Sequence, residues 1–178
     1  RRGGGDESTV FNGREGAWSA RLVGIGKRSV TLEILDQTAP PAAGPDLELV
    51  VAIVKRTRLE TIVEKAAELG ARRVRLVVTE RTNAEHARVP RLQAIAIEAA
   101  EQCGVLRIPQ VDDVAALTKT VEAWVSGGTP LIFCDEDAPV RNPITALGAL
   151  TPGPVAVLIG PEGGFDAEER RLLLSKPF

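Results

Sequence analysis

From residue 47 onward the sequence alternates short apolar runs with amphipathic stretches, and this alternation constrains the fold more than any other feature. The run LELVVAIV at 47–54 is nearly continuous and rich in β-branched residues, which is typical of a strand covered on both faces. Strand–helix alternation predicts a parallel sheet with right-handed crossovers, and therefore an α/β fold. Further strands are predicted at 74–79, 131–134 and 155–159.

The stretches between these strands carry the signals that begin and end helices. Thr57 and Glu60 have the spacing of a capping box, and Gly70 lies where a left-handed C-cap is expected. The last helix has the same kind of start, with Asp166 as its N-cap and Glu169 three residues later. The remaining helices are predicted at 90–103, at 114–125 and shortly after residue 143.

The segment before residue 45 is predicted to form small antiparallel β structure. Asn12 and Gly13 make a dipeptide that tolerates the positive φ of a tight hairpin turn. Apolar and polar residues then alternate over 18–22 and again over 30–34. Because two or three strands are marginally stable alone, the segment is expected to belong to a small barrel or to pack on the rest of the chain. The proline-rich stretch that ends it divides the chain into domains at 1–44 and 45–178.

Composition excludes several kinds of site. Cys103 and Cys134 have no CxxC partner, which argues against a disulfide scaffold or a zinc ribbon and fits a reducing cytoplasm. His86 is the single histidine, so neither a histidine-based metal site nor a Ser-His-Asp triad is expected, and we predict no metal. No apolar run approaches the ~18 residues of a membrane span, so we predict no membrane partner.

Charge is divided unevenly along the chain. Residues 1–110 carry 17 Lys and Arg against 14 Asp and Glu, whereas residues 111–178 carry 5 against 10. Such asymmetry can mark a part that faces a polyanion joined to an acidic part. Ordinary scatter of surface charges is the simpler interpretation of these numbers alone.

The stretch 155–165 is the most informative for function. A predicted buried strand runs directly into the glycine-rich sequence GPEGGF, at the strand end where ligands bind in open α/β sheets. The glycines allow the backbone to approach a ligand closely. The loop has neither the Gly-Lys-Ser/Thr ending of a Walker A loop nor the GxGxxG pattern, and its charged residue, Glu162, suits a cationic or hydroxyl-rich ligand. A tight turn without a ligand is the alternative.

GPEGGF at 160–165, with the acidic residues after it, closely resembles the S-adenosylmethionine loop of the SPOUT methyltransferases, in particular the 16S ribosomal RNA (uracil-N3) methyltransferase family. Other segments resemble that family's motifs in the same order along nearly the whole chain. They are FNG at 11–13, Lys55 and Arg56 with EKAAELG at 64–70, TERT at 79–82, and EAAEQCG at 98–104.

The resemblance implies a small PUA-like β-barrel followed by a SPOUT-type trefoil-knotted parallel-sheet domain, in a homodimer. The implied reaction is methyl transfer from S-adenosylmethionine to N3 of a uridine in 16S ribosomal RNA or the small ribosomal subunit, with Arg81 stabilising the uridine anion. The implied cofactor-binding residues are Glu136, Leu158, Ile159, Gly160, Glu162, Gly163 and Gly164. The implied RNA-binding residues are Lys55, Arg56, Arg58, Lys65, Arg81 and Gln102.

Two departures from the family pattern accompany the resemblance. The family's segment that threads the knot is expected after the last helix but does not occur before Phe178, and the N-terminal barrel is expected to be incomplete. Val105 stands where family members often have an arginine, and Arg107 is a candidate to replace it. Two alternatives stay open: a non-catalytic RNA-binding module with a degenerate cofactor loop, and a SPOUT methyltransferase acting on another RNA.

Overall fold

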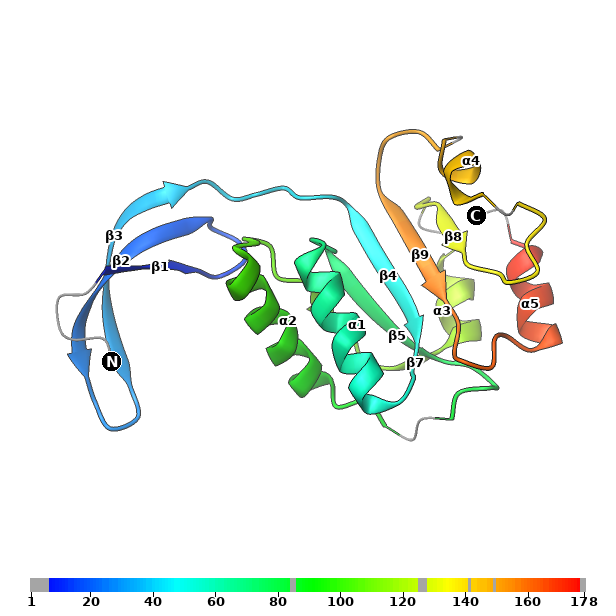
Figure 1. Ribbon diagram of the computed structural model, residues 1–178, viewed down its shortest axis with the longest axis horizontal. Coiled ribbons are helices and arrows are strands. Elements are labelled where there is room, and N and C mark those ends of the chain that lie inside the picture. Colours follow the sequence, from blue (N-terminus) through cyan, green and yellow to red (C-terminus); the bar gives the residue numbers. More distant parts are fainter. Residues whose placement is uncertain (1–6, 84–85, 125–127, 141, 149, 177–178) are drawn as a thin grey trace.

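The computed structural model describes residues 7–176 apart from 84–85, 125–127, 141 and 149, and it contains two sheets (Figure 1). The N-terminal sheet is antiparallel, in the order β1-β2-β3. The second sheet is parallel, in the order β6-β5-β4-β9-β8, and the short strand β7 pairs with β5. A mixed α/β architecture with a parallel sheet is therefore confirmed.

The predicted strands and helices occur in the predicted order, with shifts at their ends. The structure adds two short strands that the sequence analysis does not predict, at 110–111 and 115–116, and the second occupies the start of the helix predicted at 114–125, which begins only at Leu117. The strands are β1 (Glu7–Phe11), β2 (Ala17–Ile25), β3 (Val30–Ala39), β4 (Leu47–Ala52), β5 (Arg73–Val78), β6 (Gln110–Val111), β7 (Ala115–Ala116), β8 (Leu131–Phe133) and β9 (Val155–Ile159). The helices are α1 (Arg56–Glu68), α2 (Val89–Cys103), α3 (Leu117–Trp124), α4 (Pro143–Leu147) and α5 (Ala167–Leu174).

Helices cover both faces of the parallel sheet, which explains the continuous apolar run of β4. Val51 and Ile53 belong to a core cluster with α1 and α2. Val50 and Ala52, which point the other way because side chains alternate along a strand, belong to a second cluster with α3 and α5. Both faces of β4 are therefore buried under helices, as the sequence predicts.

One predicted helix start is correct and one is wrong. At α5 the Asp166 side chain accepts a hydrogen bond from the Glu169 N–H, and the Glu169 side chain accepts one from the Asp166 N–H, so the predicted capping box is present. At α1 the N-cap is Lys55, and no side chain caps the helix. Glu60 instead accepts a hydrogen bond from Arg56 Nε at 3.0 Å. The helix starts too early for Thr57 to act as a cap.

Residues 12–16 connect β1 to β2, which is a longer connection than the tight hairpin turn predicted at Asn12 and Gly13. The Asn12 side chain accepts hydrogen bonds from the N–H groups of Arg14 and Glu15 at 2.9 and 3.0 Å, and Gly13 adopts a φ of +79°. Three strands do not by themselves close a barrel, so barrel closure stays a prediction. The linker runs to β4, where Arg107 Nη1 donates to the Pro45 carbonyl at 3.0 Å.

Within the described ranges, no helix is long and apolar enough to cross a membrane. The same residues contain no group of three or more His, Cys, Asp and Glu side chains that could hold a metal ion.

Candidate functional site

The carboxyl ends of four neighbouring parallel strands meet at one edge of the sheet, where ligands bind in folds of this kind. Across that edge, the loops are arranged in the strand order β5-β4-β9-β8. The segments are 79–82, 55–58, 160–165 and 134–137. Strand order therefore places the glycine-rich loop after β9 between the arginine-bearing segments after β4 and β5 and the acidic segment after β8.

The glycine-rich loop is a closed turn whose glycines have different surroundings. The Gly164 N–H donates to the Pro161 carbonyl at 2.9 Å, and Gly164 has a φ of +67°, which favours glycine. A Cβ at Gly164 would lie 3.1 Å from Glu136 Oε1, and one at Gly160 would lie 2.7 Å from the Phe165 ring. At Gly163 a Cβ would meet only ordinary contacts at 3.7 Å, from Arg81.

Aromatic and ionic contacts hold the loop against β8. Phe165 packs edge-on against Phe133, with ring centroids 5.1 Å apart. Asp135, whose side chain is 8% exposed, accepts from Arg170 Nε at 3.0 Å and from Nη2 at 2.8 Å. These hydrogen bonds from Arg170 hold the pKa of the Asp135 carboxyl below its usual value. Desolvation raises the pKa of the Cys134 thiol, so this group stays neutral at pH 7.

A hollow of about 210 Å³ lies between the glycine-rich loop and the segment after β8. Its charged lining is mostly acidic, and Arg170, the one cation among the described lining residues, is already paired with Asp135. The hollow therefore favours a cationic ligand. Its carboxylates are Asp135, Glu136, Asp137 and Glu162.

Basic groups lie on the other side of the same loop. Arg81 Nη1 donates to the Gly163 carbonyl at 2.8 Å, and Arg58 Nη1 donates to Glu162 Oε1 at 3.2 Å. Arg58, Lys55 and Arg56 are all exposed around the start of α1. The site thus has an acidic hollow on the β8 side and a basic rim on the β4 and β5 side.

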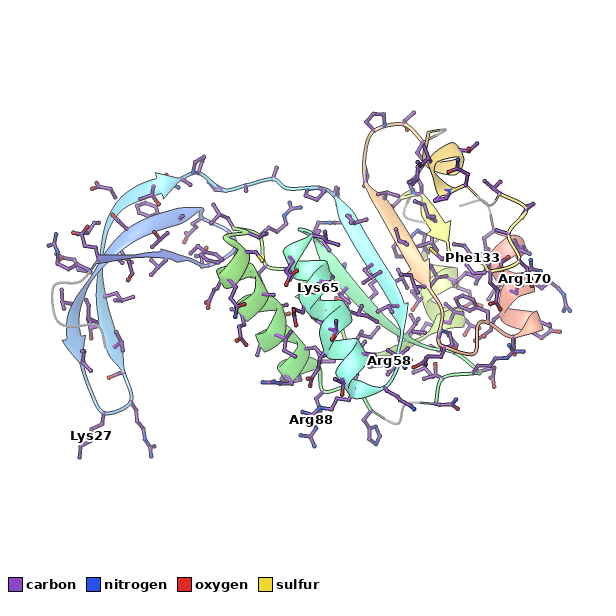
Figure 2. The ribbon with its side chains drawn as sticks, viewed as in Figure 1. Lys27, Arg58, Lys65, Arg88, Phe133 and Arg170 are labelled. Carbon is purple, nitrogen blue, oxygen red and sulfur yellow. The ribbon has the colours of Figure 1, made fainter. Side chains whose placement is uncertain are left out.

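Three predicted site residues lie away from the acidic hollow and the basic rim. Lys65 is about 10 Å along α1 from Arg58, at the rise of an α-helix, and is paired with Glu64 and Glu68 at 2.9 and 2.8 Å (Figure 2). These carboxylates raise the pKa of Lys65, Glu68 having the larger effect. Gln102 lies near the far end of α2, within 3.5 Å of Glu98.

Leu158 is the third of these residues. Its side chain is fully buried in the core beneath the site, and its carbonyl accepts the Cys134 N–H at 3.0 Å. The side chain of Leu158 cannot reach a ligand at the edge, whereas its neighbour Ile159 is 42% exposed and lines the acidic hollow.

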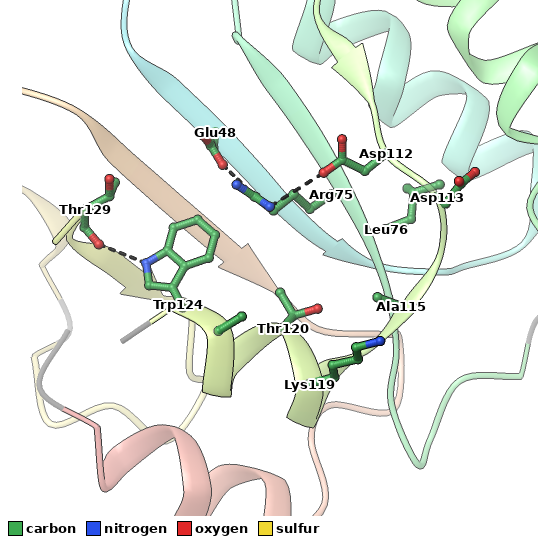
Figure 3. A pocket seen from close by; sticks show the side chains of 11 residues that line it. Glu48, Arg75, Leu76, Asp112, Asp113, Ala115, Lys119, Thr120, Trp124 and Thr129 are labelled. Atoms are coloured by element: carbon green, nitrogen blue, oxygen red, sulfur yellow. Dashed lines mark hydrogen bonds and ion pairs between the residues drawn. The ribbon is translucent and has the colours of Figure 1, made fainter. Parts of the chain in front are cut away.

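A larger hollow, of about 310 Å³, lies on the α3 side of the sheet near the ends where the strands begin (Figure 3). Its charged groups largely satisfy one another: Arg75 binds Glu48 at 2.7 Å and Asp112 at 3.6 Å, and lies 5.0 Å above the Trp124 ring. With these groups paired, we regard the carboxyl edge as the better candidate site.

Sequence reasoning missed contacts that hold the site together. The pair Asp135–Arg170 and the stacking of Phe165 over Gly160 join residues whose proximity depends on the packing of β8, β9 and α5. A weak signal for the pair existed, since Asp135 comes directly after a strand and Arg170 lies one turn into the helix after the loop.

Comparison with known proteins agrees with the motifs. Residues 42–178 match a family described as the RNA methyltransferase domain. The Rickettsia conorii protein named Ribosomal RNA small subunit methyltransferase E is 27% identical over 172 residues, covering 96% of this chain and 69% of that protein. The Mycobacterium bovis protein of the same name is 30% identical over 153 residues, covering 81% of this chain and 58% of that protein. This chain thus spans 58 to 69% of these two relatives.

Solved structures show the same arrangement. A Neisseria gonorrhoeae Ribosomal RNA small subunit methyltransferase E bound to S-adenosyl methionine superposes with a TM-score of 0.80 at 26% identity, over 97% of this chain and 72% of that one. A Legionella pneumophila protein in complex with the cofactor SAM superposes with a TM-score of 0.84 at 27% identity, over 99% of this chain and 74% of that one. The family resemblance inferred from the motifs is confirmed: this chain belongs to the RNA methyltransferase domain family.

Proposed function

We propose that this protein transfers a methyl group from S-adenosylmethionine to N3 of a uridine in 16S ribosomal RNA. The observation that carries the proposal is the separation of charge across the glycine-rich loop, with carboxylates on one side and Arg58 and Arg81 on the other. S-adenosylmethionine is a sulfonium cation and RNA is a polyanion, so each ligand has a matching side. The names of the similar proteins support the same reaction.

The residues of the acidic hollow fit this cofactor. The glycines remove side chains that would block its approach, Ile159 offers an apolar wall, and Glu136 and Glu162 offer carboxylates to a cation or to hydroxyl groups. When bound, the cofactor supplies an activated methyl group. The chain itself supplies orientation and electrostatics.

Arg81 is the proposed catalytic residue. It is exposed, and Nη1 donates to the Gly163 carbonyl, so its side chain extends along the loop that would contact the cofactor. A cation there stabilises the negative charge that develops on uracil N3 as its proton leaves. Lys55, Arg56 and Arg58 are proposed to bind RNA phosphates; Lys65 and Gln102 are proposed to contact RNA away from the reacting base.

The finer features of the fold are proposed with the function. We place a PUA-like barrel at 1–44 and a SPOUT domain with a trefoil knot at 45–178, acting in the cytoplasm as a homodimer on the small ribosomal subunit. The support is the family resemblance together with the parallel sheet order β5-β4-β9-β8 and the separate antiparallel sheet.

The experiment is calorimetry with S-adenosylmethionine, and then mapping of methylated nucleotides in 16S ribosomal RNA from cells with and without the protein. We expect saturable cofactor binding and one N3-methyluridine that is lost with the protein. RNA binding without any cofactor binding would favour the non-catalytic module, and loss of a methyl group from a different RNA would favour the other methyltransferase.

The RNA-binding part has its own test. Replacing Lys55, Arg56 and Arg58 by alanine should weaken RNA binding and lower the salt slope by roughly 0.7–0.9 for each lost phosphate contact. Lys119→Ala, which removes an exposed charge from α3, is the control and should leave the slope unchanged. A triple variant with the parent's affinity and slope would mean that these three charges are only solvated.

A further inference from the structure

A buried carboxylate lies directly behind the proposed site. Glu169 in α5 is 6% exposed, and it is one of only three polar or charged residues buried within the described part of the chain. A carboxylate without partners is costly to bury, so its contacts must compensate. The same part of the chain contains no ion pair to Glu169.

Two backbone N–H groups satisfy this carboxylate, and they come from different loops. Oε2 accepts from the Asp166 N–H at 3.1 Å, as expected of a capping box. Oε1 accepts from the Glu80 N–H at 2.9 Å. Glu80 is 89 residues away in sequence and lies just after β5.

The second bond is not needed for capping. A capping box requires only the reciprocal bonds between the N-cap residue and the third helical residue, here Asp166 and Glu169. The bond to Glu80 instead fixes the loop that carries Arg81. The other side of that turn is closed locally, because Thr82 Oγ1 accepts from the Thr79 N–H at 2.9 Å.

Arg81 makes a second connection between the same two loops. Its Nη1 donates to the Gly163 carbonyl at 2.8 Å, so the turn after β5 is held from the Glu80 backbone on one side and from the Arg81 side chain on the other. Glu169 thereby links the start of α5, the glycine-rich loop and Arg81.

We propose that Glu169 is a positioning residue. By accepting the hydrogen bond from the Glu80 N–H, it fixes the position of Arg81 relative to the Gly163 carbonyl. The proposal rests on the proposed function, because Arg81 must be part of the reaction for its position to affect the rate. A shift of about 1 Å in such a group is enough to lower a rate roughly 100-fold.

Three variants separate this role from helix capping. Glu169→Gln keeps the size of the side chain but offers one acceptor and an NH₂ group to two N–H donors, so one bond must fail. Glu80→Pro removes the donor while leaving the capping box intact, at the second position of a turn, which favours proline. Asp166→Ala is the control: it weakens the cap but leaves the bond from Glu169 to Glu80 in place.

The first measurement is amide hydrogen exchange at residues 80–82 in the full-length protein without cofactor. We expect Glu169→Gln to speed exchange there roughly tenfold or more, while Asp166→Ala leaves it close to the parent's value. The second is steady-state methylation of 16S ribosomal RNA. Here Glu169→Gln and Glu80→Pro should lower kcat at least tenfold with little change in the KM for RNA, and Asp166→Ala should not.

Equal effects of Glu169→Gln and Asp166→Ala on exchange and on kcat would reduce Glu169 to a capping residue and overturn the proposal. If Glu169→Gln does not fold, Glu80→Pro decides alone, and an unchanged kcat in that variant has the same meaning. Failure of the parent protein to methylate RNA would count against the proposed function, whereas the exchange result still decides whether Glu169 holds the Arg81 loop.

Discussion

Two adjacent glycines of the glycine-rich loop should respond to the same substitution in opposite ways. Gly163 has ordinary backbone geometry, and a Cβ there would lie 3.7 Å from Arg81, so Gly163→Ala introduces no clash. By restricting the unfolded chain, it should stabilise the protein by about 0.4–1 kcal/mol. Gly164 has a φ of +67°, where an alanine costs about 1–2 kcal/mol, and its Cβ would also press on Glu136 at 3.1 Å.

Cofactor binding should distinguish a ligand site from a bare turn. A Cβ at Gly163 faces Arg81, and Gly163 is not among the residues that line the acidic hollow. If bound S-adenosylmethionine reaches the Arg81 side of the loop, an added methyl group there overpacks the contact at a cost of about 1–3 kcal/mol, or about 5- to 150-fold in Kd. Gly163→Ala would then be a stable protein with poor cofactor affinity. Gly163→Ala is therefore a better test of cofactor binding than Gly164→Ala, because a loss of binding in a stable protein cannot be attributed to unfolding.

The assay pairs urea unfolding with calorimetry for both variants. We expect Gly163→Ala to unfold at the parent's midpoint or above it and to bind S-adenosylmethionine at least fivefold more weakly. Gly164→Ala should lose both stability and affinity. A Gly163→Ala protein that binds the cofactor as tightly as the parent would refute a cofactor contact on the Arg81 side of the loop, and unchanged affinity in both variants would refute the assignment of this loop to the cofactor.

Two further predictions concern charge pairs. Asp135→Asn should lower the free energy of unfolding at neutral pH. Because the pKa of Asp135 is lowered in the folded protein, the difference in unfolding free energy between variant and parent should vanish as pH falls through and below the ordinary aspartate value of about 3.9. Urea unfolding across that range tests this, and a difference that does not change with pH would contradict it. Glu48→Ala removes a side chain that is 5% exposed and lies between Arg72 and Arg75, and it should lower the free energy of unfolding by about 1–3 kcal/mol. Asp46→Ala removes one partner of an exposed ion pair and should lower it by only about 0–1 kcal/mol. Urea unfolding of both variants measures the difference, and equal losses would contradict the prediction.

The longer strands and the α5 cap could be predicted because their signals are local, whereas the two-residue strands β6 and β7 are too short to show a pattern. The apolar run of β4 and the pair Asp166 and Glu169 act through neighbours a few residues away, so a sequence window contains the cause. The same kind of signal failed at Thr57 and Glu60, where Arg56 takes the glutamate as an ion-pair partner and the helix begins one residue before the expected cap. Local propensity is overridden when a competing local contact exists.

The contacts that join the site could not be predicted in this way. Arg58–Glu162 spans 104 residues and Glu80–Glu169 spans 89, so each depends on which strands become neighbours in the sheet. The family resemblance implies candidate residues but not the distances between them, so it groups Lys65 with Arg58 although the two lie about 10 Å apart on one helix. Residue types indicate which charges and hydrogen-bonding groups are available. Only the packing of the strands and helices determines how far apart those groups lie.

The charge asymmetry in the sequence and the charge separation at the site have one topological cause. The arginine-bearing segments come after β4 and β5, early in the chain, and the acidic segment comes after β8, late in the chain. If β9 lay at the edge of the sheet, its glycine-rich loop would border one of these groups only. Because β9 pairs with β4 on one side and with β8 on the other, the loop borders both. Strand order alone thus converts an uneven distribution of charge along the sequence into acidic and basic groups on opposite sides of a single loop, which is the arrangement that the proposed cofactor and RNA require.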